Sequence, residues 1–163
     1  MKIKIEFSRQ GNFIITLLLI YFVFFGYLAN VFPTSIDLNF MIETSIGEGV
    51  LFLYQVLFHP ESFFSLIILM AIVFFMVFRE QFFEYGIRNA FWLTPIIIGI
   101  SWFWYWFVAD FDLTFILWYF IRIETYITIA TLYSVIMLTA ILAATAKEKY
   151  KIYKEKLKKV TIK

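Results

Sequence analysis

The chain has 163 residues, of which 63% are hydrophobic, 23% are aromatic and only 16% are charged. A soluble domain of this length is about half apolar and about a quarter charged. Here the apolar residues fall in long blocks, which is typical of an integral membrane protein. The chain has no cysteine and one histidine, which excludes disulfides, thiol chemistry, iron–sulfur clusters and a His-rich metal site within it.

The first predicted element is a membrane-spanning helix over residues 13–32. This run has no charged residue and is long enough to cross about 30 Å of hydrocarbon at about 1.5 Å per residue. Asn12 is expected to cap its start, and Pro33 stops it. A cleavable signal peptide is the rival interpretation. We expect an uncleaved span, because the apolar run is longer than a usual signal core and no good cleavage site follows it.

The second span is predicted over residues 60–78, behind a shorter apolar run. Residues 34–49 form a polar connection that has three carboxylates and no basic residue. Residues 50–58 are too few to cross a bilayer alone, so we expect them to form an interfacial or re-entrant helix. Pro60, with Glu61 beside it, is typical of a helix start.

The third span is predicted over residues 90–108, after a tight connection at 79–89. Asn89 is expected to cap this helix. Pro95 cannot donate a hydrogen bond to the carbonyl four residues before it, which predicts a kink. Pro95 and Gly99 together are therefore a candidate hinge.

Two charged residues, Arg122 and Glu124, separate a short apolar run from a long one. Residues 113–121 are too few to span and are expected to be interfacial or re-entrant, whereas residues 125–146 form the fourth span. This division keeps both charges at the outer interface and avoids the cost of about 2.5–3.5 kcal/mol for a charge at the bilayer centre. Glu124 would then lie at the positive end of the fourth helix.

The C-terminal tail, residues 147–163, carries eight Lys and two Glu and is predicted to continue the fourth helix into the cytoplasm. Its apolar residues recur at the spacing of one helical stripe. They are Tyr150, Tyr153, Leu157 and Val160. The basic face could hold anionic headgroups, at about 1 kcal/mol per Lys near the surface, or dock a cytoplasmic partner. The candidate contacts are Lys147, Lys149, Lys151, Lys154, Lys158 and Lys159.

The distribution of basic residues predicts the topology, because Lys and Arg favour the cytoplasmic side. If the N-terminus, the 79–89 connection and the tail share that side, 13 of the 14 basic residues lie there. The expected fold is an all-α integral membrane protein with four spans. Both termini would be on the cytoplasmic or matrix side of a cell membrane or an organelle inner membrane. Residues 1–146 form one transmembrane domain, and residues 147–163 form the tail.

Few residues are candidates for catalysis or for binding an ion or ligand. An outer acidic set could bind a cation or line an entrance, or it could be only a solvated face. It consists of Glu61, Asp110, Asp112 and Glu124. Arg122 could contact an anionic ligand or a lipid phosphate, although an interfacial ion pair is the simpler expectation. Its candidate partners are Glu61, Asp110 and Asp112, because Glu124 is two residues away and would not face it on a helix. His59 is a candidate metal or haem ligand only if another chain supplies partners, and otherwise it is a polar interface residue.

The sequence contains no nucleophile–base pair, no Gly-rich phosphate loop and no metal-ligand cluster. The middles of the predicted spans hold no ionisable residue, which a self-contained pump or ion carrier normally shows. The spans carry more Phe, Trp and Tyr than four thin helices can bury among themselves.

We therefore expect a non-catalytic subunit that packs and stabilises a larger multi-subunit membrane complex, for example a bioenergetic one. Its partners would be other integral subunits and bound lipid, with no cofactor in this chain and no nucleic acid. The alternative is a small homo-oligomeric channel or transporter with an acidic outer entrance. A lipid-modifying enzyme that uses His59, Glu61 and Arg122 is a third interpretation.

Overall fold

The computed structural model describes residues 7–28, 52–58, 63–80, 82–108 and 115–161. Every regular element within these ranges is a helix, which confirms the all-α prediction for them. In chain order the elements are α1 (Phe7–Leu19), the π-helical segment η1 (Ile20–Phe24), α5 (Phe52–Phe58), α6 (Phe63–Arg79), α7 (Phe83–Val108), α8 (Phe115–Ile121) and α9 (Ile123–Thr161).

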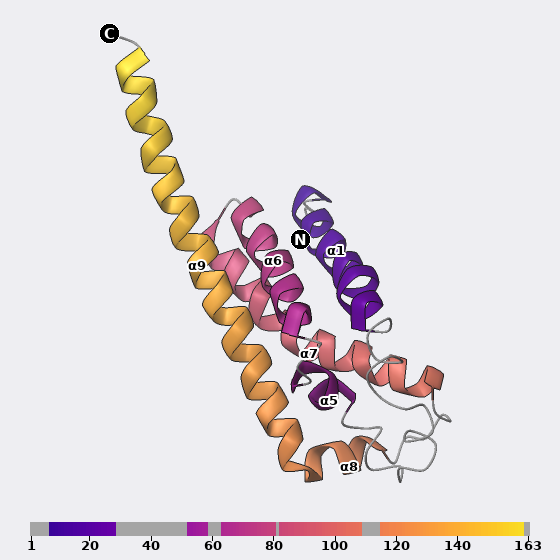
Figure 1. Cartoon of the computed structure of the whole chain (residues 1–163). Helices are drawn as coiled ribbons and strands as arrows, with labels where there is room; N and C mark the ends of the chain where they lie inside the picture. The colour runs from indigo at the N-terminus through magenta and orange to yellow at the C-terminus, as the bar shows by residue number, and fades with distance from the viewer. Residues whose placement is uncertain (1–6, 29–51, 59–62, 81, 109–114, 162–163) are drawn as a thin grey trace, which may run out of the picture.

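The long helix α9 organises the bundle (Figure 1). Helices α6 and α7 pack along it, and α1 with η1 packs on α6. The short helix α5 lies against α6, α7 and α9, and α8 turns back at the start of α9. The C-terminal part of α9 projects beyond the other helices (Figure 1), and we call its residues 147–161 the extension.

Small side chains allow α9 to approach its neighbours closely. Ala140, Ala143 and Ala144 are all buried, as their small size predicts. Thr131 is half-buried, whereas Ser134 is exposed and does not pack between the described helices. The α6–α7 hairpin has a similar close approach, because a Cβ atom added at Gly86 would lie 3.0 Å from Cγ1 of Val77.

Two described segments, residues 10–28 and 123–157, are long and apolar enough to cross a membrane. The apolar helix at residues 64–79 is shorter than a standard span. These findings support an association with a membrane, and the count of four spans stays a prediction.

Two predicted helix starts were wrong. The first helix begins at Phe7 and the third at Phe83, so Asn12 and Asn89 lie inside helices instead of capping them. Their side-chain amides instead bond to groups on a neighbouring helix. Helix α7 runs continuously through Pro95, and the kink and the hinge with Gly99 stay predictions.

The short predicted helices are present in the parts that the structure describes. Helix α5 covers most of residues 50–58, and α8 covers most of residues 113–121; their placement at the membrane surface stays a prediction. Helix α9 is unbroken to Thr161, as expected for a tail that continues the fourth helix.

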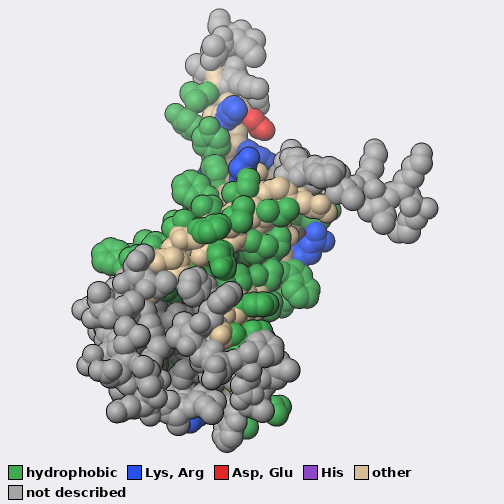
Figure 2. Space-filling view, turned by 90° about the vertical axis from the view of Figure 1, so that its right-hand side faces the viewer, with side chains coloured by type: hydrophobic (Ala, Val, Ile, Leu, Met, Phe, Trp, Pro, Cys, Tyr) green, Lys and Arg blue, Asp and Glu red, His purple; other side chains and the backbone are tan. Residues whose placement is uncertain are grey.

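Large apolar side chains face outward over much of the bundle. Those on α1 and η1 include Ile14, Leu18, Phe22 and Val23, and those on α6 include Phe64, Ile67 and Phe75. Figure 2 shows hydrophobic side chains covering much of the visible part of the bundle, with Lys and Arg side chains on the extension and at the bundle edge below it. Such a belt fits a hydrocarbon environment or the surfaces of partner helices.

Candidate functional site

A buried carboxylate, Glu80, lies where α1, α6 and α7 meet. Glu80 directly follows α6, and its backbone N–H bonds to the carbonyl oxygens of Met76 and Val77 at 3.2 Å each. The hydrogen bonding of α6 thus continues onto Glu80 and orients its side chain. The residue is only 5% exposed, which is unusual for Glu, because a buried carboxylate needs hydrogen-bond donors or a cation.

The donors come from two other helices. The Asn12 amide on α1 donates one hydrogen bond to Oε1 of Glu80 at 3.0 Å and another to the carbonyl oxygen of Met76 at 3.1 Å. Asn89 on α7 donates to the same Oε1 at 3.5 Å. Asn12 therefore uses both of its N–H groups to hold α1 against the end of α6. We call Asn12, Glu80 and Asn89 the polar lock.

The polar lock contributes to stability chiefly through the charge-assisted bond from Asn12 to Glu80, a kind of bond worth about 1.5–3 kcal/mol, whereas the Asn89 contact at 3.5 Å is weaker. Both hydrogen-bond partners found for the Glu80 carboxylate within the described residues are neutral amides. These amides donate hydrogen bonds to the Glu80 carboxylate but do not neutralise its negative charge. The remaining electrostatic partner is a lysine of α9.

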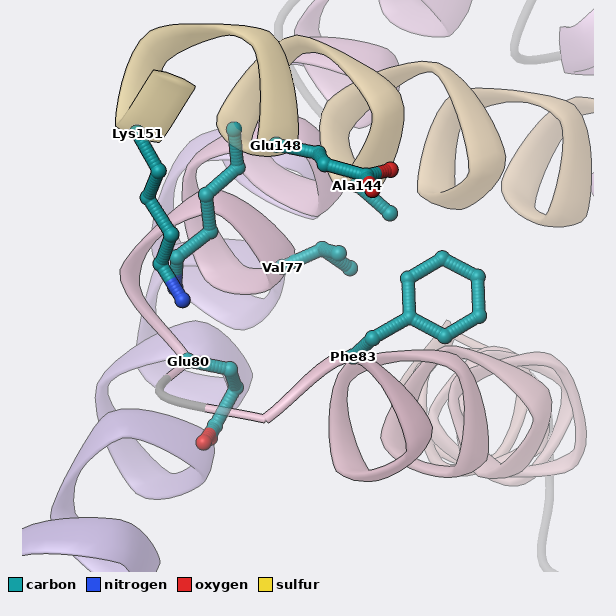
Figure 3. A pocket seen from close by; sticks show the side chains of 7 residues that line it. Val77, Glu80, Phe83, Ala144, Glu148 and Lys151 are labelled. Atoms are coloured by element: carbon teal, nitrogen blue, oxygen red, sulfur yellow. The ribbon is translucent and has the colours of Figure 1, made fainter. Parts of the chain in front are cut away.

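A pocket of about 320 Å³ separates Glu80 from α9. Its apolar lining is Val77, Phe83 and Ala144, and its charged lining is Glu80, Lys147, Glu148 and Lys151. Figure 3 shows the Lys151 side chain reaching from α9 toward the end of α6, and the Phe83 ring on the α7 side. The pocket therefore combines an apolar wall with two cations and two carboxylates.

Electrostatics couple the pocket to the polar lock. Partial burial lowers the pKa of Lys147, the nearby Lys151 lowers it further, and the Glu80 carboxylate acts in the opposite direction. Lys147 lies one residue beyond the predicted end of the fourth span. The Lys147 ammonium is thus attracted by the Glu80 carboxylate and repelled by the Lys151 ammonium. An anionic group bound between the two lysines would reduce this repulsion.

The opposite end of the bundle is closed by the α8–α9 corner. The Thr125 hydroxyl donates to the carbonyl of Tyr119 at 2.6 Å, and the Tyr126 hydroxyl donates to the carbonyl of Phe120 at 2.8 Å. These bonds satisfy carbonyl groups that the end of a helix leaves free. The Tyr119 ring packs edge-on against Trp102 of α7, with centroids 5.5 Å apart.

Two polar atoms at this corner are buried with no hydrogen-bond partner among the described residues: the Tyr119 hydroxyl and Oε2 of Glu124. Burial raises the pKa of Tyr119 to about 12. Glu124 lies in the first turn of α9, as predicted from the helix dipole. Arg122 is exposed in the break between α8 and α9.

His59 and three members of the outer acidic set, Glu61, Asp110 and Asp112, lie outside the described residues. The ion pair predicted for Arg122 stays a prediction for the same reason. Of the six candidate lysines, Lys147 and Lys151 share the pocket, whereas Lys149 and Lys154 are exposed on the extension. The side chains of Lys158 and Lys159 are not described. Pro95 and Gly99 are both in α7 and do not join any of these groups.

Sequence reasoning missed the polar lock, because it assigned residues 79–89 to a tight connection and Asn12 and Asn89 to helix caps. One signal in the sequence could have indicated it: Asn12, Glu80 and Asn89 are polar residues at the ends of the apolar runs.

Within the described residues no group of three or more His, Cys, Asp or Glu side chains could hold a metal ion. Comparisons with protein families, curated proteins and solved structures found no match.

Proposed function

We propose that this chain is a non-catalytic integral subunit that packs and stabilises a larger multi-subunit membrane complex. The observation that carries the proposal is the shape of α9. It combines a helix long and apolar enough to cross a membrane with a basic extension of about 22 Å, at 1.5 Å per residue. Lipid can cover the apolar belt of the bundle but not a surface that stands outside the bilayer. A protein partner can cover both.

The proposed topology has four spans with both termini on the cytoplasmic or matrix side. The polar lock and the pocket support it, because they bring together Asn12 of the first helix, Glu80 of the 79–89 connection and Lys147 at the start of the extension. These are the three segments that hold nearly all basic residues, and one end of the bundle holds all three.

Single-cysteine labelling tests this topology without background, because the chain has no cysteine of its own. Glu84→Cys and Glu155→Cys are expected to react with an impermeant reagent from the same side of the membrane, and Arg122→Cys from the other side. Labelling of all three positions from one side would contradict the four-span arrangement.

Purification in a mild detergent tests the subunit role. The chain is expected to migrate with other integral subunits at a mass well above its own 19.5 kDa. A stable, homogeneous species that contains only this chain would contradict the proposal.

Bound lipid is the second component of the proposal, and the pocket is its proposed site. Lys147 and Lys151 suit a phosphate, Glu80 and Glu148 suit an ammonium, and the apolar wall suits the start of an acyl chain. This mixed lining matches a zwitterionic phosphoethanolamine headgroup better than a purely anionic one. Native mass spectrometry is expected to show preferential retention of phosphatidylethanolamine over phosphatidylglycerol, and Lys147→Ala/Lys151→Ala should abolish that preference. Equal retention of both lipids would contradict the assignment.

The alternative function, a small homo-oligomeric channel or transporter, is favoured by one observation. Glu80 is a buried carboxylate near a membrane-spanning bundle, and such residues commonly mark ion or proton pathways. Flux through the purified chain in liposomes that falls with Glu80→Gln would favour this alternative. We expect no flux, because both hydrogen-bond partners found for Glu80 hold it in a structural contact between helices.

A further inference from the structure

One seam of mostly apolar residues runs along α9 from the bundle into the extension. Its positions alternate three and four residues apart, as in the a and d positions of a heptad repeat. In the bundle these positions are buried and are occupied by Leu132, Ile136, Thr139 and Ala143. In the extension the same register continues with Tyr150, Tyr153 and Leu157, which are 54%, 60% and 50% exposed.

The seam stays on one face of the helix over this distance. A straight α-helix drifts by about 20° per heptad, so the three heptads from Ile136 to Leu157 rotate the seam by about 60°. An apolar stripe on a packed helix is wider than this, at about 100° or more. Tyr150 contacts Phe78 near the end of α6, with ring centroids 6.1 Å apart, and the seam continues past this contact. The surface that packs α9 in the bundle is therefore continuous with the exposed surface of the extension.

Lysines occupy the positions that flank the seam in the extension. Lys149 and Lys156 precede a seam residue, Lys154 follows one, and all three are exposed. Glu148 lies off the seam and lines the pocket beside Glu80, and Glu155, seven residues later, is exposed off the seam. In paired helices the flanking positions of the two chains face each other in either orientation. A second copy of this chain would therefore place lysine against lysine, whereas a helix with acidic flanks would place carboxylates there.

A membrane surface is a poorer match for this seam. Helix α9 is unbroken and contains neither Gly nor Pro, so it has no point at which the extension could fold down onto the bilayer. If the span ends at Ala146, Tyr153 lies about 10 Å and Leu157 about 16 Å beyond it, at 1.5 Å per residue. The headgroup region adds about 5–7 Å beyond the hydrocarbon, so Leu157 stands about 10 Å above it, which is beyond the Debye length of about 8 Å at physiological ionic strength. Phosphate groups of a nucleic acid would leave the apolar residues of the seam uncovered.

We infer that the extension is a docking helix for a partner protein that presents an acidic amphipathic helix on the cytoplasmic side. The apolar stripe of the partner packs on Tyr150, Tyr153 and Leu157, and its flanking Asp or Glu side chains face Lys149, Lys154 and Lys156. This inference rests on the proposed subunit role and names the chemistry of one partner.

The test uses the full chain in nanodiscs of neutral lipid and a fluorescent synthetic peptide of three heptads, with Leu at the a and d positions and Glu at the flanking positions. Fluorescence anisotropy is expected to show saturable binding. Leu157→Ala should weaken binding tenfold or more. Ile152→Ala is the matched control, because Ile152 is also 50% exposed but lies off the seam, and it should change binding by less than threefold.

Two further peptides separate the apolar and charged contributions. A scrambled acidic peptide of the same composition keeps the charge but not the stripe, and a peptide with Lys at the flanking positions keeps the stripe but not the charge. Both are expected to bind at least tenfold more weakly. Equal binding of either peptide, equal effects of the two alanine substitutions, or contact of Tyr153 with a quencher in anionic lipid would each overturn the inference.

Purification of the Leu157→Ala variant distinguishes this inference from the subunit role. If the variant still migrates with integral subunits and loses only a soluble one, both proposals stand. If the wild-type chain migrates alone but binds the acidic peptide through the seam, the subunit role fails and the docking helix stands. If the wild-type complex forms and the variant keeps every component, the docking helix fails and the subunit role stands.

Discussion

The two ends of the helical bundle differ in how their buried polar groups are hydrogen-bonded. At the end that carries the extension, the buried carboxylate of Glu80 receives amide donors from two helices. At the α8–α9 corner, the Tyr119 hydroxyl and Oε2 of Glu124 are buried, and no residue in the described part of the chain hydrogen-bonds to them. Burying a polar group without a partner costs about 1–3 kcal/mol. At the first end the buried carboxylate therefore has hydrogen-bond donors from this chain, whereas at the second end no described residue supplies one.

This difference bears directly on the proposed subunit role. A protein that functions alone is expected to satisfy its buried polar groups, because each unsatisfied group lowers a small net stability. The α8–α9 corner does not do so. A partner helix, a lipid headgroup or a water molecule at Tyr119 would remove that cost.

Breaking the polar lock is expected to have the largest effect. Asn12→Ala should lower the free energy of unfolding by about 2–3 kcal/mol, because it leaves the buried Glu80 carboxylate with the longer bond from Asn89. Denaturation of the purified chain measures this loss. In the Glu80→Gln background the same substitution should cost less, because no buried charge remains. Equal losses in both backgrounds would show that Asn12 acts independently of Glu80.

The close approach of α6 and α7 beside the polar lock predicts a smaller effect. Gly86→Ala should destabilise the chain by about 1–2 kcal/mol, because the new Cβ atom would lie 3.0 Å from Cγ1 of Val77 and force the helices apart. Gly99→Ala in the same helix is the control. No atom lies within 4 Å of its added Cβ, so it should stabilise by about 0.5–1 kcal/mol through helix propensity. Thermal unfolding of both variants tests the contrast.

The α8–α9 corner predicts the smallest effect at neutral pH. Tyr119→Phe removes a buried hydroxyl that has no partner and should stabilise the isolated chain by up to about 1 kcal/mol. If a partner subunit supplies a hydrogen bond to this hydroxyl, the same substitution should destabilise the assembled complex. The sign of the change in unfolding free energy, measured in both states, decides whether the corner is completed from outside.

The dependence of stability on alkaline pH tests whether the Tyr119 hydroxyl is buried. The pKa of Tyr119 is raised from 10.0 to about 12 in the folded chain, so the folded state holds its proton while the unfolded state loses it. The free energy of unfolding therefore falls by about 1.4 kcal/mol per pH unit between pH 10 and about 12, because burial disfavours the ionised phenolate in the folded chain. Tyr119→Phe should remove that part of the pH dependence. An identical alkaline profile for both proteins would contradict the burial of the hydroxyl.

Most of the helices could be predicted from the sequence, because their apolar runs are long and uninterrupted. The end of α6 was predicted within one residue, and the unbroken α9 was expected. The start of α7 was placed seven residues too late. Residues 83–89 contain Glu84, Arg88 and Asn89, whose polarity resembles that of a loop, and only the packing of Gly86 on Val77 shows that they belong to the hairpin.

The sequence by itself determined that this chain is helical, that its apolar runs suit a membrane, and that its cations lie at the ends of those runs. Hydrophobicity and helical periodicity are local properties, and neighbouring residues are enough to specify them. Only the tertiary structure decided that Asn12 and Glu80, which are 68 residues apart, share a hydrogen bond, and that Tyr119 is buried without one. Such pairings depend on how helices are rotated and shifted against each other, and that geometry follows from side-chain packing across the whole bundle.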